Sequence, residues 1–312
     1  MSLTGITILF AGSGAFGVPT LQQLIADGAT IAGVYTQPDK PAGRGNRLTP
    51  TPIAAFAREA GLTTIATPDI TAETRPPADL LVVIAFGQKL SPAVVDHARL
   101  GAVNLHASRL PKFRGAAPIN WAIIRGEATT GNSVIRLAQK MDAGAVLAMS
   151  EIAIGELETA GELHDRLSID GADLVSDVAS RLRTGTASPV EQLHDAATIA
   201  PKLSRERAAI DWTLEAQTIA NQIRGMHPWP GCRVRVLDAG GVEVDRMTLI
   251  RARASGPLKR PCPVANVLDD GTVACGGGSL EIVELQPDGR KPMSLAAYRN
   301  GKRWDEGMRI VS

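Results

Sequence analysis

A short polar run near the middle of the chain contains residue types that acyl transfer requires. Asn104 and His106 are separated by a single leucine. Alternate side chains of a β-strand point to the same side, so a strand here would place both residues on one face. A histidine can act as a general base near neutral pH, and a carboxamide can donate a hydrogen bond to an oxygen that becomes negative when a carbonyl carbon is attacked. The pair therefore indicates acyl transfer, although an isolated triplet of this kind is more often a structural histidine beside a turn-forming asparagine.

Two nearby polar residues extend or compete with this interpretation. Asp142 occupies a short glycine-containing turn, where a carboxylate could orient the imidazole, but spacing alone favours an ordinary turn aspartate. Ser108 suggests a Ser-His-Asp hydrolase, yet it lacks the G-x-S-x-G sequence that exposes such a nucleophile. The residues alone therefore favour acyl transfer and leave a hydrolase as the second choice.

The first apolar run is followed by a glycine-rich turn, GSGAFG at residues 12–17. Its spacing matches the dinucleotide fingerprint, in which a pyrophosphate sits on the N-terminus of a helix. That fingerprint also needs an acidic residue at the end of the second strand, and the chain has none before Asp39, which lies beyond a proline. We favour a tight strand-to-helix turn and keep dinucleotide binding as the alternative.

A basic segment follows the second predicted strand, at the same edge of the expected sheet. Lys40, Arg44 and Arg47 are interspersed there with glycines, which allow a backbone to approach a folded nucleic acid closely. The formal net charge of the whole chain is only +1, so a polyanionic partner would have to bind a local patch such as this one. The alternative is an ordinary solvated loop.

The elements that must position these residues follow an alternating pattern in the first half of the chain. Apolar runs of strand length at residues 7–11, 31–35, 80–85 and 102–106 alternate with helical segments at 16–26, 53–60 and 92–98. This pattern is typical of βαβ units, so we predict a Rossmann-like α/β domain with a predominantly parallel sheet. Residues 133–139 and 145–154 would add a hairpin to that sheet, and Thr159 with Glu162 forms a capping box for a helix that runs to residue 183.

The last third of the chain has a different pattern. After a helix near residues 214–224, short β-like runs are separated by glycine turns, which predicts a small OB-like β-barrel. The segment before it has no clear period and contains two prolines. We therefore expect a catalytic domain at residues 1–183, a linker at 184–206 and a barrel domain at 207–312.

Composition places the chain among ordinary globular proteins. Apolar residues make up 44% of its 312 residues and charged residues 21%, which argues against disorder, collagen or a coiled coil. Its three cysteines form no CxxC pair, which argues against a disulfide framework and a zinc site and favours the cytoplasm. No signal peptide is expected, and the longest apolar run is far shorter than the roughly 20 residues that a membrane span needs.

Taken together, these motifs resemble the methionyl-tRNA formyltransferase family over nearly the whole chain. The similarity rests on TQPDKPAGRG (36–45), NLHASRLPKFRGAAPI (104–119), MDAG (141–144), KLS (202–204), IDW (210–212), IR (223–224), PWP (228–230) and LQP (285–287). The N-x-H, S-x-L-P and Asp elements are shared more widely among folate-dependent formyltransferases, including those that act on glycinamide ribonucleotide.

The resemblance implies formyl transfer from 10-formyltetrahydrofolate to the α-amine of methionyl initiator tRNA. It assigns catalysis to Asn104, His106 and Asp142, with no metal, and tRNA contacts to Lys40, Arg44 and Arg47. It assigns folate contacts to two segments: Phe86, Gly87, Gln88, Lys89 and Leu90 at the pterin, and Ser108, Arg109, Leu110 and Pro111 in the loop after the catalytic strand. We expect a cytoplasmic monomer whose partners are folate and tRNA and which has no membrane association.

The chain departs from the family pattern at three places. Arg109 stands where a leucine is usual in the folate loop. The turn after Asp142 is shorter than usual, and Asn46 replaces a common lysine in the basic segment.

Three other functions remain to be distinguished. Formyl transfer to a small amine would use the same trio but has no need for residues 207–312. A noncatalytic RNA-binding protein would bind tRNA without folate. A formyltetrahydrofolate hydrolase would have no use for a tRNA platform.

Overall fold

A computed structural model describes residues 2–42 and 45–312 of the chain. Contacts divide the chain into two compact units. The first consists of Met1–Gly115, Gly131–Ile152 and His164–Ile199, and the second of Ala116–Thr130, Ala153–Leu163 and Ala200–Ser312. The last boundary between the two units, at Ile199 and Ala200, falls inside the predicted linker. The domain bounds drawn from the sequence remain a prediction.

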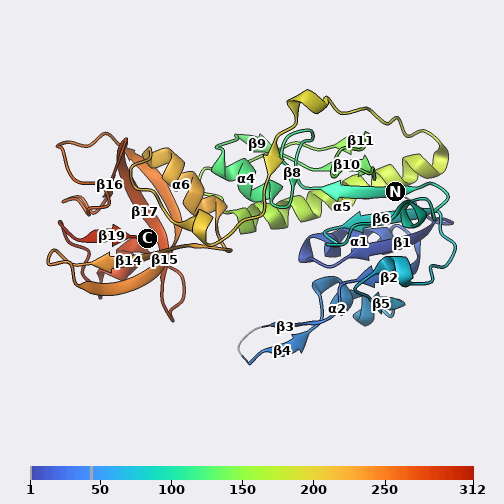
Figure 1. The fold of residues 1–312 in the computed structure, drawn as a ribbon, viewed down its shortest axis with the longest axis horizontal. Coiled ribbons are helices and arrows are strands. Elements are labelled where there is room, and N and C mark those ends of the chain that lie inside the picture. Colours follow the sequence, from blue (N-terminus) through green and yellow to red (C-terminus); the bar gives the residue numbers. More distant parts are fainter. Residues whose placement is uncertain (1, 43–44) are drawn as a thin grey trace. The chain divides into compact units, whose positions relative to one another are not determined.

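The first unit is built on a seven-stranded sheet in the order β11-β10-β7-β6-β1-β2-β5 (Figure 1). Its strands are β1 (Thr7–Gly12), β2 (Thr30–Thr36), β5 (Thr64–Ala66), β6 (Leu80–Ile84), β7 (Ala102–His106), β10 (Ser133–Arg136) and β11 (Val146–Met149). The strands from β7 to β5 are parallel, whereas β10 runs antiparallel to β7 and β11 antiparallel to β10. The predominantly parallel sheet with an added hairpin is thus confirmed.

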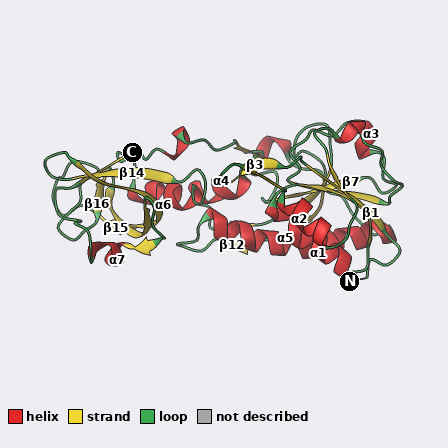
Figure 2. Ribbon diagram, turned by 90° about the horizontal axis from the view of Figure 1, so that it is seen from below, coloured by secondary structure: helices red, strands yellow, loops and turns green. Residues whose placement is uncertain are grey.

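Both faces of this sheet are buried, which explains why its central strands are continuous apolar runs. Leu9 and Ala11 point to the face where α3 (Pro92–Val95) packs, and Phe10, next to them, faces α2 (Pro52–Glu59) on the other side. Figure 2 shows α1 (Val18–Ala26), α2 and α5 (Ala160–Thr184) together on one side of the sheet and α3 on the other. The polar ends of the strands are therefore the places where side chains can meet a ligand.

The glycine-rich turn after β1 is tightly packed. A Cβ on Gly12 would lie 2.8 Å from Cε1 of Phe10 and 2.9 Å from the carbonyl oxygen of Ile84. The Ser13 hydroxyl donates to the Phe86 carbonyl at 3.3 Å and accepts from the Gln37 amide N–H at 3.1 Å. The turn thus joins the carboxyl ends of β1, β2 and β6, as expected for a tight strand-to-helix turn.

The second unit contains a nearly closed antiparallel barrel. Its strands are β14 (Cys232–Leu237), β15 (Glu243–Gly256), β16 (Val273–Cys275), β17 (Gly278–Pro287), β18 (Met293–Ser294) and β19 (Arg309–Val311). Five of them follow the order β16-β17-β15-β14-β19, and β18 pairs with β17. Residues 266 and 267 bridge to Arg309 and Val273, which brings the two ends of this path together. The OB-like β-barrel is thus confirmed.

Helices of the second unit pack closely on one another. α4 (Pro118–Ile124) lies against α6 (Ala216–Gly225), where the Asn120 amide donates to the Gly225 carbonyl at 2.7 Å. A Cβ on Gly225 would lie only 2.5 Å from Cγ1 of Ile124, so a larger residue would force the two helices apart.

Several elements differ from the sequence-based expectation. Helix α3 ends at Val95, earlier than expected, and α7 (Leu295–Arg299), whose cap is Ser294, was not predicted. The basic segment contains a short hairpin of β3 (Lys40–Ala42) and β4 (Arg47–Thr49), which projects away from the sheet (Figure 1). The remaining short strands are β8 (Arg114–Gly115), β9 (Thr129–Thr130), β12 (Ile152–Ala153) and β13 (Ile199–Ala200). Among the described residues, no helix is long and apolar enough to cross a membrane.

Candidate active site

His106 ends strand β7, and both of its ring nitrogens face protein oxygens. Its Nε2 lies 2.9 Å from the carbonyl oxygen of Phe113, and its Nδ1 lies 3.7 Å from Oδ2 of Asp142. The His106 side chain is 7% exposed and that of Asp142 is 15% exposed, so little water screens the pair. The structure therefore brings together the histidine and the aspartate that the sequence analysis singled out.

The hydrogen bond at Nε2 determines the arrangement of protons on the ring. A carbonyl oxygen can only accept, so Nε2 must carry a hydrogen. In the neutral ring Nδ1 then presents a lone pair towards the Asp142 carboxylate, whereas in the imidazolium it presents an N–H. Each nitrogen of the ring thus has a protein oxygen beside it, and a ring N–H must turn from that oxygen to reach a ligand.

Asn104 lies two residues before His106 on the same face of β7. In the ladder it is opposite Val83 of β6 and Ile135 of β10, and its side chain is half-buried. Among the described residues, no group forms a hydrogen bond with its carboxamide. Its two amide hydrogens are therefore free to bind a ligand oxygen, as the interpretation as an oxyanion donor requires.

Asp142 belongs to the turn between β10 and β11, and its backbone is in the left-handed region with φ 51°. Besides facing His106, its Oδ2 accepts the Gly115 amide N–H at 2.8 Å. Asp142 is thus a turn residue and a neighbour of the imidazole at once, so the two alternatives drawn from the sequence are compatible.

Ser108 does not act as the nucleophile of a triad in this arrangement. Its side chain is fully buried, and its hydroxyl donates to the Lys112 carbonyl at 2.6 Å. Ser133, which the sequence analysis did not single out, accepts the Leu110 amide N–H at 3.0 Å and donates to the Ser108 carbonyl at 2.7 Å. These bonds fix the loop from Ser108 to Pro111 against β10.

Arg109, the departure from the family pattern in this loop, has a partner of its own. Its guanidinium forms an ion pair with the Glu151 carboxylate, and both side chains are about half exposed. Such an exposed pair contributes about 0–1 kcal/mol. Arg109 thus lies at the surface of the loop, while Leu110 beside it is buried.

The other predicted folate segment, residues 86–90, follows β6. Phe86 is buried, and its carbonyl accepts from Ser13 and from the Gln37 amide, both at 3.3 Å. Gln88 uses its own amide inside the protein, accepting from the Ile70 N–H and donating to the Thr67 carbonyl. Gly87 is exposed with φ 79°, and Lys89 is exposed. The groups left for a ligand are therefore mainly those of the backbone.

The predicted tRNA contacts lie on the β3–β4 hairpin. Lys40 and Arg47 are both exposed. Arg44 lies outside the described residues. Leu48, between Arg47 and Thr49 on β4, is 72% exposed, so the hairpin displays apolar as well as basic groups.

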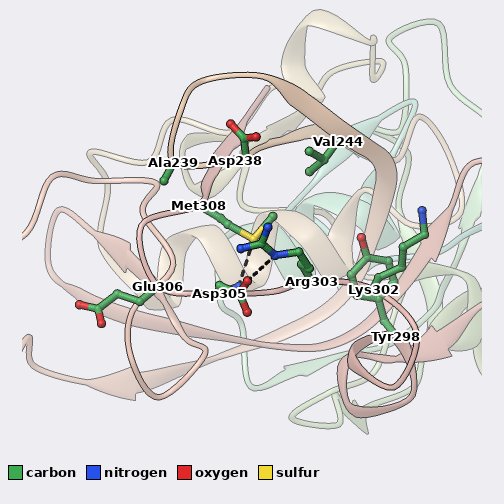
Figure 3. A pocket seen from close by; sticks show the side chains of 9 residues that line it. All are labelled: Asp238, Ala239, Val244, Tyr298, Lys302, Arg303, Asp305, Glu306 and Met308. Atoms are coloured by element: carbon green, nitrogen blue, oxygen red, sulfur yellow. Dashed lines mark hydrogen bonds and ion pairs between the residues drawn. The ribbon is translucent and has the colours of Figure 1, made fainter.

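A cavity of about 250 Å³ lies in the second unit and is lined by none of the predicted site residues (Figure 3). Its lining carries both charges, and Arg303 pairs with Asp305 there at 2.7 Å. Among the described residues, no group of three or more His, Cys, Asp or Glu side chains is arranged to hold a metal ion.

Comparison with known proteins identifies the family. Residues 5–179 match the family model described as Formyl transferase, and residues 202–303 match Formyl transferase, C-terminal domain. A methionyl-tRNA formyltransferase of Geobacter metallireducens is 39% identical over 315 residues, which cover 99% of each chain. Another, of a Geobacillus species, is 39% identical over 95% of this chain and 94% of its own.

Among solved structures, an N-formyltransferase of Helicobacter canadensis in complex with folinic acid and dTDP-3-aminofucose has the same fold. It has a TM-score of 0.66 at 14% identity, covering 90% of this chain and 99% of its own. Such a low identity shows the fold alone, whereas the sequence relatives extend over both units. The chain belongs to the methionyl-tRNA formyltransferase family.

Proposed function

We propose that the protein transfers the formyl group of 10-formyltetrahydrofolate to the α-amino group of methionyl initiator tRNA. The observation that carries the proposal is the end of β7. There an imidazole shares one face with a carboxamide that has no hydrogen-bond partner among the described residues, and an aspartate oxygen lies 3.7 Å from the ring. These groups suit attack of an amine on a formyl carbon. The relatives' name supplies methionyl-tRNA as the acceptor, and the family resemblance supplies 10-formyltetrahydrofolate as the donor.

Asn104 and His106 have complementary roles in this reaction. As the neutral amine attacks, negative charge develops on the formyl oxygen, and the Asn104 amide with the protonated His106 ring stabilises it. His106 then donates one ring proton to the departing nitrogen and recovers a proton from the attacking amine nitrogen, for which that ring N–H must turn from its protein oxygen towards the reactants. No covalent bond to the enzyme is needed, because holding both reactants in line supplies effective molarity.

Asp142 acts on the ring. Its carboxylate faces Nδ1 and stabilises the imidazolium, while the Phe113 carbonyl fixes Nε2. Together they hold the orientation of the ring, as the aspartate does in a Ser-His-Asp triad.

The residues around β6 and β7 fit a folate donor. Gly87 exposes backbone at the end of β6, next to the buried Phe86, and the folate loop follows directly on His106. We assign the pterin to residues 86–90 and the donor's reactive end to residues 108–111. The donor itself supplies the activated formyl group.

The direct test is formylation of methionyl initiator tRNA and methionyl elongator tRNA side by side, with 10-formyltetrahydrofolate as donor. We expect the initiator to be formylated far faster, with Lys40, Arg44 and Arg47 contributing to its binding. Ala variants of Asn104, His106 and Asp142 should fold and lose most turnover. No formylation of either tRNA, or near-normal activity of all three variants, would contradict the proposal.

We also infer that the protein is a cytoplasmic monomer. Cys232 and Cys275 are buried and unpaired, as expected in a reducing compartment, and burial raises the pKa of both thiols to about 12. Sedimentation of the free protein and of its tRNA complex tests the oligomeric state, and a dimer in either would contradict it.

A further inference from the structure

The segment of residues 190–198, in the predicted linker, contacts both loops that hold His106. Val190 forms an antiparallel bridge with Val146 of β11, with both N–H···O distances at 2.8 Å. At its other end the Thr198 hydroxyl accepts the Phe113 N–H at 2.8 Å, and the Thr198 carbonyl accepts the Arg114 N–H at 2.9 Å. The segment is thus anchored at one end to β11, which follows the Asp142 turn, and at the other end to the loop of Phe113 and Arg114.

Gln192 lies between these anchors and is only 7% exposed. Its amide nitrogen donates to the carbonyls of Asp142 at 2.9 Å and Gly144 at 2.7 Å. Its amide oxygen accepts from Nε and Nη2 of Arg114 at 3.2 and 2.6 Å. Both hydrogens and both lone pairs of one carboxamide are therefore used, and they join the Asp142 turn to the loop at Phe113–Gly115.

Arg114 makes this contact costly to lose. Its side chain is buried at 4% exposure, and the acceptors at its guanidinium are Gln192 and Nδ1 of His194. No ion pair to Arg114 is found among the described residues. A buried cation needs hydrogen-bond acceptors, so removing the Gln192 oxygen leaves it poorly satisfied and free to shift the loop.

The Phe113–Gly115 loop and the Asp142 turn each contain a residue in a strained backbone conformation, which contacts from other segments must stabilise. Phe113 and Asp142 both have left-handed backbones, with φ of 59° and 51°, which non-glycine residues adopt only when their surroundings hold them. Phe113 presents its carbonyl to Nε2 of His106, and Asp142 presents its carboxylate to Nδ1. A change in either loop would therefore alter what one ring nitrogen faces.

We propose that Gln192 is a positioning residue for catalysis: by joining the Phe113–Gly115 loop to the Asp142 turn, it holds His106 between its two oxygen partners. Gln192 acts through these loops and not on the reactants. The kinetic part of its test rests on the proposed formyl transfer, whereas the state of the His106 ring can be measured whatever the reaction is.

The test compares Gln192→Met with Gln222→Met. Methionine matches the length of glutamine but forms no amide hydrogen bonds. Gln222 is a suitable control because its amide also donates to two backbone carbonyls, those of Arg207 and Ala209, at 3.0 and 2.9 Å. We expect Gln192→Met to lower kcat about 10²-fold, the size of loss associated with a misplacement of about 1 Å, with KM for donor and tRNA within about twofold. Gln222→Met should keep the wild-type kcat.

The second readout is the ¹⁵N spectrum of the imidazole rings, with His106 assigned through His106→Gln among the five histidines. Wild type and Gln222→Met should show a His106 Nε2–H that is hydrogen-bonded to an oxygen, as the 2.9 Å contact with the Phe113 carbonyl requires, and Gln192→Met should show a mixture of rings with and without that bond. A second variant, Thr198→Val, lies at an exposed position and removes only the hydroxyl that accepts the Phe113 N–H. It should lower kcat severalfold, and it is the variant to measure if Gln192→Met does not fold.

The outcomes separate the two proposals. A wild-type protein that forms no formylmethionyl-tRNA contradicts the proposed function, while the ring spectrum still tests Gln192. Wild-type kcat together with a wild-type ring spectrum in the Gln192 variant, or in Thr198→Val if the former is unfolded, overturns the positioning role. So does a kcat for Gln192→Met that is no lower than that of Gln222→Met.

Discussion

Replacing Asp142 by asparagine removes one charge from the candidate site and changes little else in its shape. The asparagine oxygen can still accept the Gly115 N–H that now lies 2.8 Å from Oδ2, so the turn keeps its anchor. The same oxygen position faces Nδ1 of His106, so an uncharged amide oxygen would stand where the carboxylate stabilises the imidazolium. The substitution therefore isolates the electrostatic role of Asp142.

The size of the effect follows from the geometry. Two unit charges at about 4 Å interact by about 4 kcal/mol at an effective dielectric constant of 20. The observed 3.7 Å is close to that distance, and both side chains are mostly buried. If about half of this energy is expressed in the transition state, the barrier rises by about 2 kcal/mol, which corresponds to a rate about 30-fold lower.

The assay is single-turnover formylation of methionyl initiator tRNA at saturating donor. Asp270→Asn is the matched control, because Asp270 also accepts a backbone N–H, that of Thr272 at 3.0 Å, and faces a cation, Lys259, at 3.7 Å. We expect the control to react at the wild-type rate. A folded Asp142→Asn protein that reacts within about threefold of wild type would refute the reasoning.

Three further changes test separate parts of the structure. Asn104→Ala should lower kcat about 10²–10³-fold, as loss of an oxyanion donor does, without changing the melting temperature by more than a few degrees; an unchanged kcat would contradict its role. Arg47→Ala should raise KM for tRNA but not for folate, and should reduce the slope of log KM against log salt by about 1; equal effects on both KM values would argue against phosphate binding. In the wild type the hydrogen bond from Arg251 lowers the pKa of Glu162 from 4.5 to about 2. Glu162→Gln removes the carboxylate charge but keeps the capping box with Thr159. A carboxyl whose pKa is lower in the folded state stabilises the fold at pH values above its unfolded pKa. Chemical unfolding should therefore show the wild type more stable than the variant by about 1 kcal/mol at pH 6, a figure reduced because the Glu162 side chain is half exposed. The difference should vanish as the pH falls from 4.5 towards 2.

The regular parts of the first unit were predictable because periodicity reports burial directly. β6 is an uninterrupted apolar run since both of its faces are covered, and β7 places Asn104 and His106 on one face since side chains alternate along a strand. The helix beginning at Ala160 was predictable from its cap, because the Thr159 and Glu162 pairing is formed within four residues. Each of these signals lies within a few residues of the element that it predicts.

Other features depend on partners that are distant in the sequence. Gln192 contacts Arg114, which is 78 residues away, and no local pattern marks either residue as a neighbour of His106. The β3–β4 hairpin was expected as a loop because its strands are short and exposed, so they carry no apolar alternation. Helix α3 stops at Val95, although its sequence allowed a longer helix, which is a tertiary effect that propensity does not report.

The surroundings of the His106 ring depend both on local strand pairing and on contacts between residues distant in the sequence. The position of His106 on β7 is set by a ladder with two neighbouring strands, so it depends on many backbone hydrogen bonds at once. Its two oxygen partners come instead from loops with left-handed residues, each held by a few side-chain contacts. Substitutions in these loops should therefore reduce catalysis before they reduce stability, whereas substitutions in the buried core of β7 should reduce both together.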